Sequence, residues 1–158
     1  MANADRVADL VIRRAVAGDA TAIAAMTEQA IRIGNAAEYS PAVIEAIVGK
    51  FNAADVAARL ALRHGLVAER DGRIVGTASL GAKVHSVFVA AEVQRRGVGA
   101  RLMGTIEAIA AQDQRRALVV SSSLTAVPFY RSLGFHFAGT ERSDEITTVL
   151  MAKLLSAD

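Results

Sequence analysis

The sequence predicts an α+β domain in which α-helices flank a mixed central β-sheet of about seven strands. Short runs with strand character alternate with longer segments whose apolar residues recur at helical spacing. Glycine, proline, asparagine and aspartate stand at the junctions, where turns and helix ends favour them. With 158 residues and neither a repeat nor a linker-like stretch, the chain is expected to form one domain, residues 1–158, with its core in roughly residues 10–155.

The first part of the chain is expected to form one strand and then three helices. The run Leu10–Arg14 is interpreted as the strand. Asp19 follows a glycine and is expected to cap the first helix. Ser40 and Pro41 predict the second, with serine as the cap and proline in the first helical position. Asn52 is expected to cap the third. The predicted helices are residues 19–33, 41–48 and 53–63.

A β-hairpin is predicted in the middle of the chain. The runs Leu66–Glu69 and Ile74–Leu80 flank Asp71-Gly72, a pair that favours a type I′ turn. Gly81 then interrupts the chain, and Val84–Val89 has the composition of a further strand.

The last part of the chain is expected to add two helices and three strands. A helix starting at Gly97 carries apolar residues on one face and ends near Gln114. Gly134 is suited to end a second, short helix. The remaining predicted elements are the strand 117–121, the short helix 125–133 and the strands 135–139 and 147–155.

Composition excludes several classes of protein. There is no cysteine, so disulfides, thiolate metal sites and cysteine nucleophiles are ruled out. No apolar run approaches the roughly 20 residues of a membrane span, and the first residues lack a signal-peptide pattern. A net charge of +2 with 4% aromatic residues argues against nucleic-acid binding, and the three histidines have no metal-ligand spacing. A cytoplasmic protein without a metal or a membrane partner is expected.

The segment Gln94–Ala100 is the strongest candidate for a binding site. It joins a predicted strand to a predicted helix, so its glycines and the helix N-terminus can hold a phosphate. A Walker A loop requires a lysine that is absent, and a dinucleotide fingerprint requires a third glycine where Leu102 stands. The acyl-CoA pattern Gln/Arg-x-x-Gly-x-Gly/Ala does fit, although two glycines at the start of a helix can also be merely structural.

Together with a second motif, this segment resembles the GNAT superfamily of acyl-CoA-dependent N-acetyltransferases. The strand before the loop ends in Val87-Phe88-Val89, as in that family. The second motif, Ala-x-x-Phe-Tyr followed by Leu-Gly-Phe, corresponds to residues 126–130 and 133–135. The opening residues 11–19 also look like the start of the family, so the resemblance covers roughly residues 10–155 in the correct order.

The resemblance implies acetyl-CoA as co-substrate and assigns residues to it. The backbone of the strand would pair with the pantetheine arm, and the loop amides would hold the diphosphate. Ser123 stands where the family often has an asparagine that contacts pantetheine; a serine reaches less far. The implied binding residues are Val87, Phe88, Val89, Gln94, Arg95, Arg96, Gly97, Val98, Gly99, Ala100 and Ser123.

Three residues are candidates for the chemistry. The resemblance places Tyr130 beside the sulfur, where a phenol can donate a hydrogen bond or a proton to the departing thiolate. It also places a base or a water-holding residue near His85 and Ser86. Because successive strand residues face opposite sides, only one of these two is expected to face the substrate. Structural roles remain the alternative for the tyrosine and the histidine.

The implied reaction is direct attack of a primary amine on the thioester, with a small-molecule amine or a protein amino group as acceptor. Residues 39–41 followed by two helices resemble a bacterial subgroup with poorly defined substrates, and a homodimer is compatible with the resemblance. Acidic residues could attract a cationic amine or could be solvated charges: Glu28, Glu38, Glu45, Glu141, Asp144 and Glu145. The rival readings are a catalytically idle acyl-CoA-binding module, an enzyme acting on charged tRNA or on a protein, and a nucleotide-binding oxidoreductase.

Overall fold

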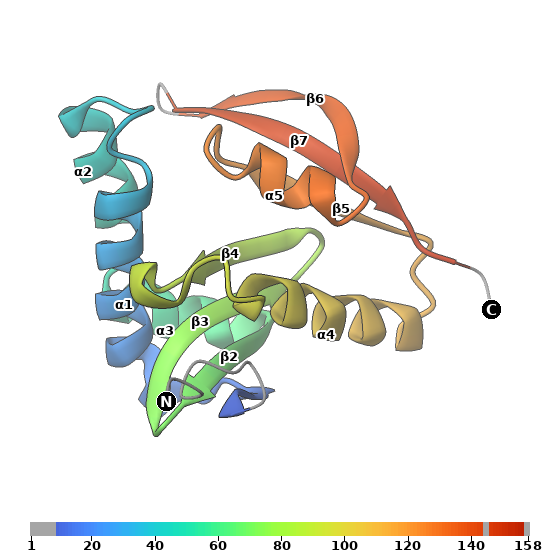
Figure 1. Ribbon diagram of the computed structural model, residues 1–158, viewed down its shortest axis with the longest axis horizontal. Coiled ribbons are helices and arrows are strands. Elements are labelled where there is room, and N and C mark those ends of the chain that lie inside the picture. Colours follow the sequence, from blue (N-terminus) through green and yellow to red (C-terminus); the bar gives the residue numbers. More distant parts are fainter. Residues whose placement is uncertain (1–8, 144–145, 157–158) are drawn as a thin grey trace, which may run out of the picture.

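The computed structural model describes residues 9–143 and 146–156, and these form one seven-stranded mixed sheet flanked by helices (Figure 1). The predicted fold class is therefore confirmed. The strands are β1 (Val11–Arg14), β2 (His64–Arg70), β3 (Arg73–Leu80), β4 (Val84–Val89), β5 (Ala117–Ser122), β6 (His136–Ser143) and β7 (Ile146–Leu154). The helices are α1 (Ala20–Gly34), α2 (Pro41–Gly49), α3 (Ala53–Leu62), α4 (Val98–Gln112) and α5 (Val127–Ser132), with short 3₁₀ turns η2 (Ala17–Asp19) and η3 (Ala91–Val93).

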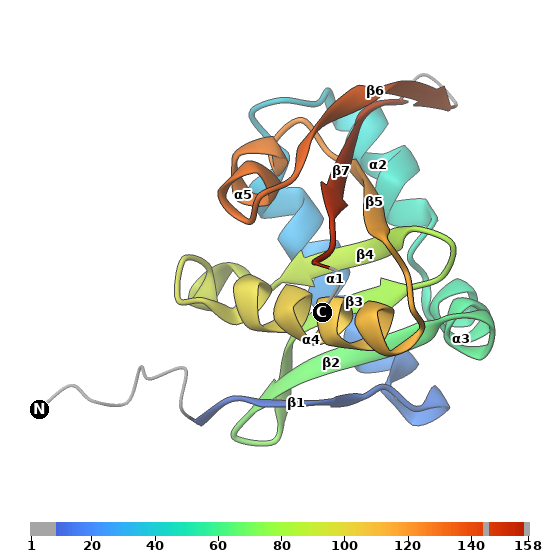
Figure 2. The same ribbon diagram turned by 90° about the vertical axis from the view of Figure 1, so that its right-hand side faces the viewer.

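The sheet has the strand order β1-β2-β3-β4-β5-β7-β6. Its neighbours are antiparallel except for β4 and β5, which run parallel. Figures 1 and 2 show α4 on one face of strands β1 to β4 and α1 and α3 on the other. Leu102 and Ile106 of α4 are fully buried, and burial of each such side chain stabilises the fold by about 1.5–3 kcal/mol.

Two of the three predicted helix caps are confirmed. The Ser40 hydroxyl accepts a hydrogen bond from the Val43 amide, and the Asn52 side chain accepts one from the Asp55 amide. Asp19 occupies the N-cap position of α1, as predicted, but its side chain makes no cap hydrogen bond to the helix. Its carboxylate turns back to accept hydrogen bonds from the Val16 amide and the Arg13 guanidinium, so it stabilises the turn η2 instead.

The predicted hairpin is also confirmed. Arg70 pairs with Arg73, which leaves Asp71 and Gly72 as a two-residue connection. Both have positive φ, 51° and 75°, as a type I′ turn requires.

The strand predicted at residues 135–139 is displaced. Phe135 lies before β6 and is fully buried, with its ring 5.5 Å from that of Tyr130. The strand itself extends to Ser143, because pairing with β7 supports polar residues that the sequence pattern did not mark as a strand.

Strands β4 and β5 separate soon after they meet, and this divergence positions the candidate site (Figure 1). Among the described residues, the ladder between them consists of the pair Val84–Val120. The joined end is tied by Lys83, whose ammonium donates to Ser121 and forms an ion pair with Glu141 of β6. Beyond this end the edge of β4 that faces β5 is left open.

No helix in the described ranges is both long enough and apolar enough to cross a bilayer.

Candidate functional site

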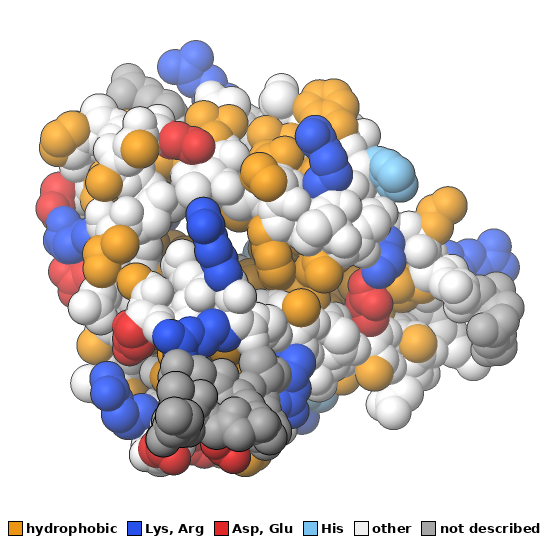
Figure 3. Space-filling view, viewed as in Figure 1, with side chains coloured by type: hydrophobic (Ala, Val, Ile, Leu, Met, Phe, Trp, Pro, Cys, Tyr) orange, Lys and Arg blue, Asp and Glu red, His pale blue; other side chains and the backbone are white. Residues whose placement is uncertain are grey.

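A cavity of about 1080 Å³ lies between the diverging strands. It is lined by parts of α1 to α3 and their loops, by β4, by the loop that leads into α4, by the end of β5, and by α5 and β7. In Figure 3 the surface is hollowed between the half of the molecule that holds α4 and the half that holds α5, and hydrophobic side chains lie in the hollow. Every predicted site residue except Arg96 borders this cavity.

The glycine loop brings the start of α4 to the cavity. Gln94 donates a side-chain hydrogen bond of 3.1 Å to the carbonyl oxygen of Val89, which holds the loop against the end of β4. Arg95 and Gly97 have φ values of 64° and 84°, and Gly97 is the N-cap of α4. The first intrahelical bond runs from the Arg101 amide to the Gly97 carbonyl. The amides of residues 98–100 therefore have no partner within the helix and are available to an anion.

Gly99 allows a close contact between the start of α4 and α5. A Cβ atom at this position would lie 2.9 Å from Cζ of Phe129, so any larger residue would require the Phe129 ring to shift. Gly99 therefore lets the start of α4 pack directly against the helix that carries Tyr130.

Tyr130 lies on α5 and is 4% exposed. Its ring makes edge contacts with the rings of Phe129 and Phe135, with centroid distances of 5.1 and 5.5 Å. Burial raises the pKa of the phenol above its ordinary value. The hydroxyl therefore stays protonated throughout the neutral range and is a hydrogen-bond donor beside the cavity, not a base.

His85 and Ser86 both border the cavity, so the expectation that only one of them faces the substrate side is wrong. Ser86 has a φ of 55°, and β4 carries one more residue than β3 between the pairs Ser79–His85 and Thr77–Phe88. This β-bulge breaks the strand alternation on which the expectation depended.

His85 is a weak base in this environment. Partial burial, and secondly the positive charges of Arg63, Lys83 and Arg59, together lower the pKa of its imidazole to about 4. The ring is therefore neutral at physiological pH. It can accept a hydrogen bond, but it retains a proton poorly.

Ser123 already has a structural partner. Its hydroxyl accepts a hydrogen bond of 3.2 Å from the Ala126 amide and so closes the turn that leads into α5. The hydroxyl proton remains able to bond a group in the cavity, which Ser123 borders.

Comparison with known proteins decides the family. The family described as "Acetyltransferase (GNAT) domain" matches residues 35–155, well over half of the chain. The chain belongs to the GNAT acetyltransferase family. No curated protein matches the sequence.

Solved structures share this GNAT fold along nearly the whole chain. A GCN5-related N-acetyltransferase from Rhodopseudomonas palustris is 28% identical, with a TM-score of 0.85 over 92% of this chain and 95% of the other. PaiA N-acetyltransferase from Thermoplasma acidophilum, solved with coenzyme A, is 17% identical, with a TM-score of 0.80 over 92% and 99%. The acetyltransferase yncA from Salmonella typhimurium, solved with acetyl-CoA, is 22% identical, with a TM-score of 0.63 over 95% and 96%.

A tyrosine that sequence reasoning did not assign to the site closes one side of the cavity of this GNAT domain. The Tyr39 hydroxyl accepts a hydrogen bond of 3.0 Å from the Leu124 amide and lies 3.4 Å from the Thr147 carbonyl oxygen. It thereby ties the loop between α1 and α2 to the loop after β5 and to β7. The sequence signal was a single aromatic residue before a helix cap, which does not reveal such a long-range contact.

Among the acidic residues considered for amine attraction, the four glutamates that the structure describes do not line the cavity of the GNAT domain. Glu28 and Glu45 both bond Arg32, Glu38 bonds the Thr125 hydroxyl, and Glu141 bonds Lys83 and Ser121. Asp144 and Glu145 lie outside the described residues. These contacts favour a structural or surface role for the described glutamates.

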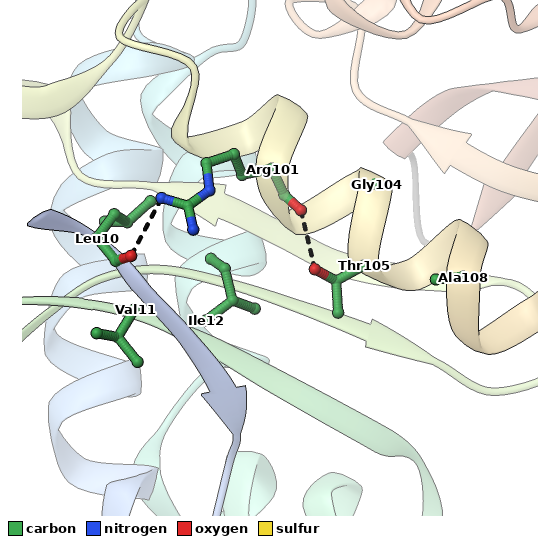
Figure 4. Close-up of a pocket in the computed structure, with 7 residues that line it drawn as sticks. All are labelled: Leu10, Val11, Ile12, Arg101, Gly104, Thr105 and Ala108. Carbon is green, nitrogen blue, oxygen red and sulfur yellow. Dashed lines mark hydrogen bonds between the residues drawn. The ribbon is translucent and has the colours of Figure 1, made fainter. Parts of the chain in front are cut away.

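A second hollow lies between β1 and α4 (Figure 4). Arg101 of α4 reaches across it and donates to the Leu10 carbonyl oxygen at 3.1 Å, while Thr105 bonds the Arg101 carbonyl. Among the described residues that line this hollow, only Arg101 is ionisable. It lacks the chemistry of the larger cavity, which remains the candidate active site.

Proposed function

We propose that this GNAT domain is an N-acetyltransferase that moves an acetyl group from acetyl-CoA to a primary amine. The observation that carries the proposal is a juxtaposition: the unpaired amides at the start of α4, the open edge of β4 and the phenol of Tyr130 border one cavity. The solved relatives with coenzyme A and acetyl-CoA support the choice of co-substrate.

The loop and strand fit the two ends of the carrier. The amides of residues 98–100, with Arg95 beside them, would hold the diphosphate. The backbone of Val87–Val89 would bond the pantetheine arm along the strand edge that β5 leaves open. Gln94 also borders the cavity, and its side-chain amide supports the loop through the Val89 carbonyl.

The proposed reaction is direct. The amine nitrogen attacks the thioester carbonyl, a tetrahedral intermediate forms, and its collapse breaks the carbon–sulfur bond while the new carbon–nitrogen bond remains. Tyr130 donates a hydrogen bond to the departing thiolate, and the proton lost by the amine goes to water or to sulfur. An acetyl-cysteine intermediate is excluded because the chain has no cysteine.

The low pKa of His85 bears on the amine's proton. A base with a pKa of about 4 is too weak to take a proton from an alkylammonium ion, whose pKa is near 10.4. The amine therefore enters in its neutral form, and His85 accepts a hydrogen bond from it or from a water molecule.

A test is the release of free thiol from acetyl-CoA with a panel of amines, amino acids and peptides. The proposal predicts acceptor-dependent release in the wild-type protein. Because His85 is a weak base, the described lining of the cavity lacks an evident group to deprotonate the amine. A second candidate function is therefore an acyl-CoA-binding module without catalytic activity. That module predicts saturable binding of CoA without release of thiol for any acceptor.

A further inference from the structure

Arg59 of α3 and Arg63, the C-cap residue that follows this helix, border the cavity. Arg59 and Arg63 are four residues apart and both line the cavity together with His85. Their effect on His85 is electrostatic, since both lower the pKa of its imidazole. The positive charge of Arg59 also acts on Arg63, and two like charges that interact in this way are unfavourable without a counter-charge.

Packing holds the first arginine in place. The ring of Phe51 meets that of Phe88 on β4 edge-on, with a centroid distance of 5.0 Å. The guanidinium of Arg59 lies over the ring of Phe51, with its Cζ atom 4.9 Å from the ring centroid. Arg59 is thus preorganised by an aromatic contact and has no carboxylate partner among the described residues.

Arg63 is held against the turn between β3 and β4. A Cβ atom placed on Gly81 would lie 3.3 Å from Cγ of Arg63, so its stem runs along that turn. Burial, and secondly the charge of Arg59, lower the pKa of this guanidinium. The fold therefore keeps two cations close together and partly desolvated, which is costly unless a ligand compensates them.

One nitrogen atom of the Arg59 guanidinium also lacks a hydrogen-bond partner among the described residues. This atom, Nη1, is buried. Arg59 also borders a small cavity of about 20 Å³ beside Thr27, Ser79 and Ser86, which has room for one water molecule. A water would satisfy this inner nitrogen but would leave the positive charge uncompensated.

The charge of the whole cavity is one-sided. Its described lining contains Lys50, Arg59, Arg63 and Arg95 and no aspartate or glutamate. Arg95 stands at the glycine loop, where the diphosphate is proposed to bind. Arg59 and Arg63 belong to the C-terminal part of α3 and the residue after it, and Figure 2 shows α3 on the other side of the molecule from the start of α4, so they point to a second anionic group.

We propose that Arg59 and Arg63 bind an anionic group of the acceptor, so that the acceptor is an amine that also carries a carboxylate or a phosphate. This inference rests on the proposed acetyl transfer and adds a substrate class to it. The guanidinium groups can bond either anion through paired N–H donors. Their field also disfavours the ammonium form of the acceptor, which favours the neutral amine that the reaction needs.

The experiment uses paired acceptors with and without the anion, and kcat/KM is expressed per concentration of neutral amine because the anion also raises the pKa of the amine. Glycine, β-alanine and larger amino acids are compared with their amides, and phosphoethanolamine is compared with ethanolamine. We expect the anionic member of at least one pair to have a kcat/KM at least about 10-fold higher. A preference within the amino-acid pairs identifies the anion as a carboxylate, and a preference within the ethanolamine pair identifies it as a phosphate. Equal or better use of every neutral partner would overturn the inference.

Variants assign the preference to the arginines. Arg59→Met and, separately, Arg63→Gln should reduce the anionic preference at least about 10-fold, mainly through KM. Arg14→Met, at an exposed arginine of β1, should leave the preference unchanged. Acetyl-CoA affinity, measured by calorimetry, should be unchanged in all three. If the wild-type protein does not bind acetyl-CoA, the proposed function is rejected instead.

Two further readouts separate binding from a merely structural role. Because Arg59 has no carboxylate partner among the described residues and a methionine can keep the contact with Phe51, Arg59→Met should unfold at about the same denaturant concentration as the wild type or a higher one; marked destabilisation would contradict the inference. If no acceptor is acetylated, binding of N-acetylglycine and N-acetylglycinamide to the CoA-bound protein is compared by NMR, with N-acetyl-phosphoethanolamine and N-acetylethanolamine as the second pair. Failure of both anions to bind more tightly than their neutral partners overturns the inference as well.

Discussion

At the scale of single residues, Tyr130 owes its proposed role to burial. The aromatic rings of Phe129 and Phe135 surround its phenol and raise its pKa. A phenol in this state donates hydrogen bonds over the whole physiological pH range. Such a donor stabilises the departing thiolate without having to lose its proton completely.

Replacement of this hydroxyl should slow the reaction without unfolding the domain. We expect Tyr130→Phe to lower turnover of acetyl-CoA at least about 10-fold, equivalent to about 1.4 kcal/mol in the activation free energy, with a modest loss of CoA affinity. Steady-state thiol release and calorimetry measure the two quantities. Unchanged turnover in a folded variant would remove Tyr130 from the mechanism.

His85 should make stability depend on pH. Its folded pKa of about 4 lies below the ordinary 6.5, because burial and three cations disfavour the imidazolium. Below pH 6.5 the unfolded chain gains a proton that the folded protein does not, so the free energy of unfolding falls between pH 6.5 and 4. Since the ring is half-exposed, the loss is reduced by solvent screening to about 1–2 kcal/mol.

The substitution His85→Gln should remove this component. Denaturant unfolding of both proteins at pH 7 and at pH 4.5 measures the difference, and carboxylates such as Asp19 contribute equally to the two. We expect the variant to lose less stability than the wild type on acidification. Parallel losses would show that His85 titrates normally.

At the scale of elements, the start of α4 carries the proposed diphosphate site. Gly97 caps the helix with a φ of 84°, which a β-branched residue adopts only with strain. Gly97→Val should therefore shift the loop and weaken acetyl-CoA binding at least about 10-fold.

A second glycine of the same helix provides the matched control. A Cβ atom on Gly104 would meet nothing within 4 Å. Gly104→Ala should keep wild-type acetyl-CoA affinity and stabilise the helix by about 0.5–1 kcal/mol. Calorimetry on both folded variants gives the comparison, and equal affinities for Gly97→Val and Gly104→Ala would argue against the loop as the diphosphate site.

Elements whose signals are local could be predicted from the sequence. Ser40, Asn52 and the pair Asp71-Gly72 each act on backbone groups within a few residues, so their caps and turn were predictable. The bulge at Ser86 was not, because it depends on the pairing of β4 with β3. The position of Asp19 at the N-cap of α1 was predictable, but the loss of its side-chain cap bond was not, since Arg13 competes for its carboxylate.

The candidate site divides in the same way. The glycine loop and Tyr130 belong to short contiguous motifs and were predicted. Arg59 lies on an amphipathic helix and Arg63 directly follows it, where charged residues ordinarily face water. Only the tertiary position of α3 brings them to the cavity.

At the scale of the whole molecule, the divergence of β4 and β5 gives one cavity two chemically different ends. One end offers free helix amides and Arg95, and the other offers Arg59, Arg63 and a neutral His85. Tyr130 borders the same cavity on α5. Cross-links at its joined end, such as the bond of Lys83 to Ser121, keep the two halves of the sheet in register.

The central claim is that the loop at the start of α4 binds the acyl-CoA carrier. Titration of acetyl-CoA into the wild-type protein, followed by calorimetry, tests it most directly. The account predicts saturable heat for one site with a Kd in the range of about 1–100 μM. No saturable heat at millimolar acetyl-CoA, with folded protein, would contradict it.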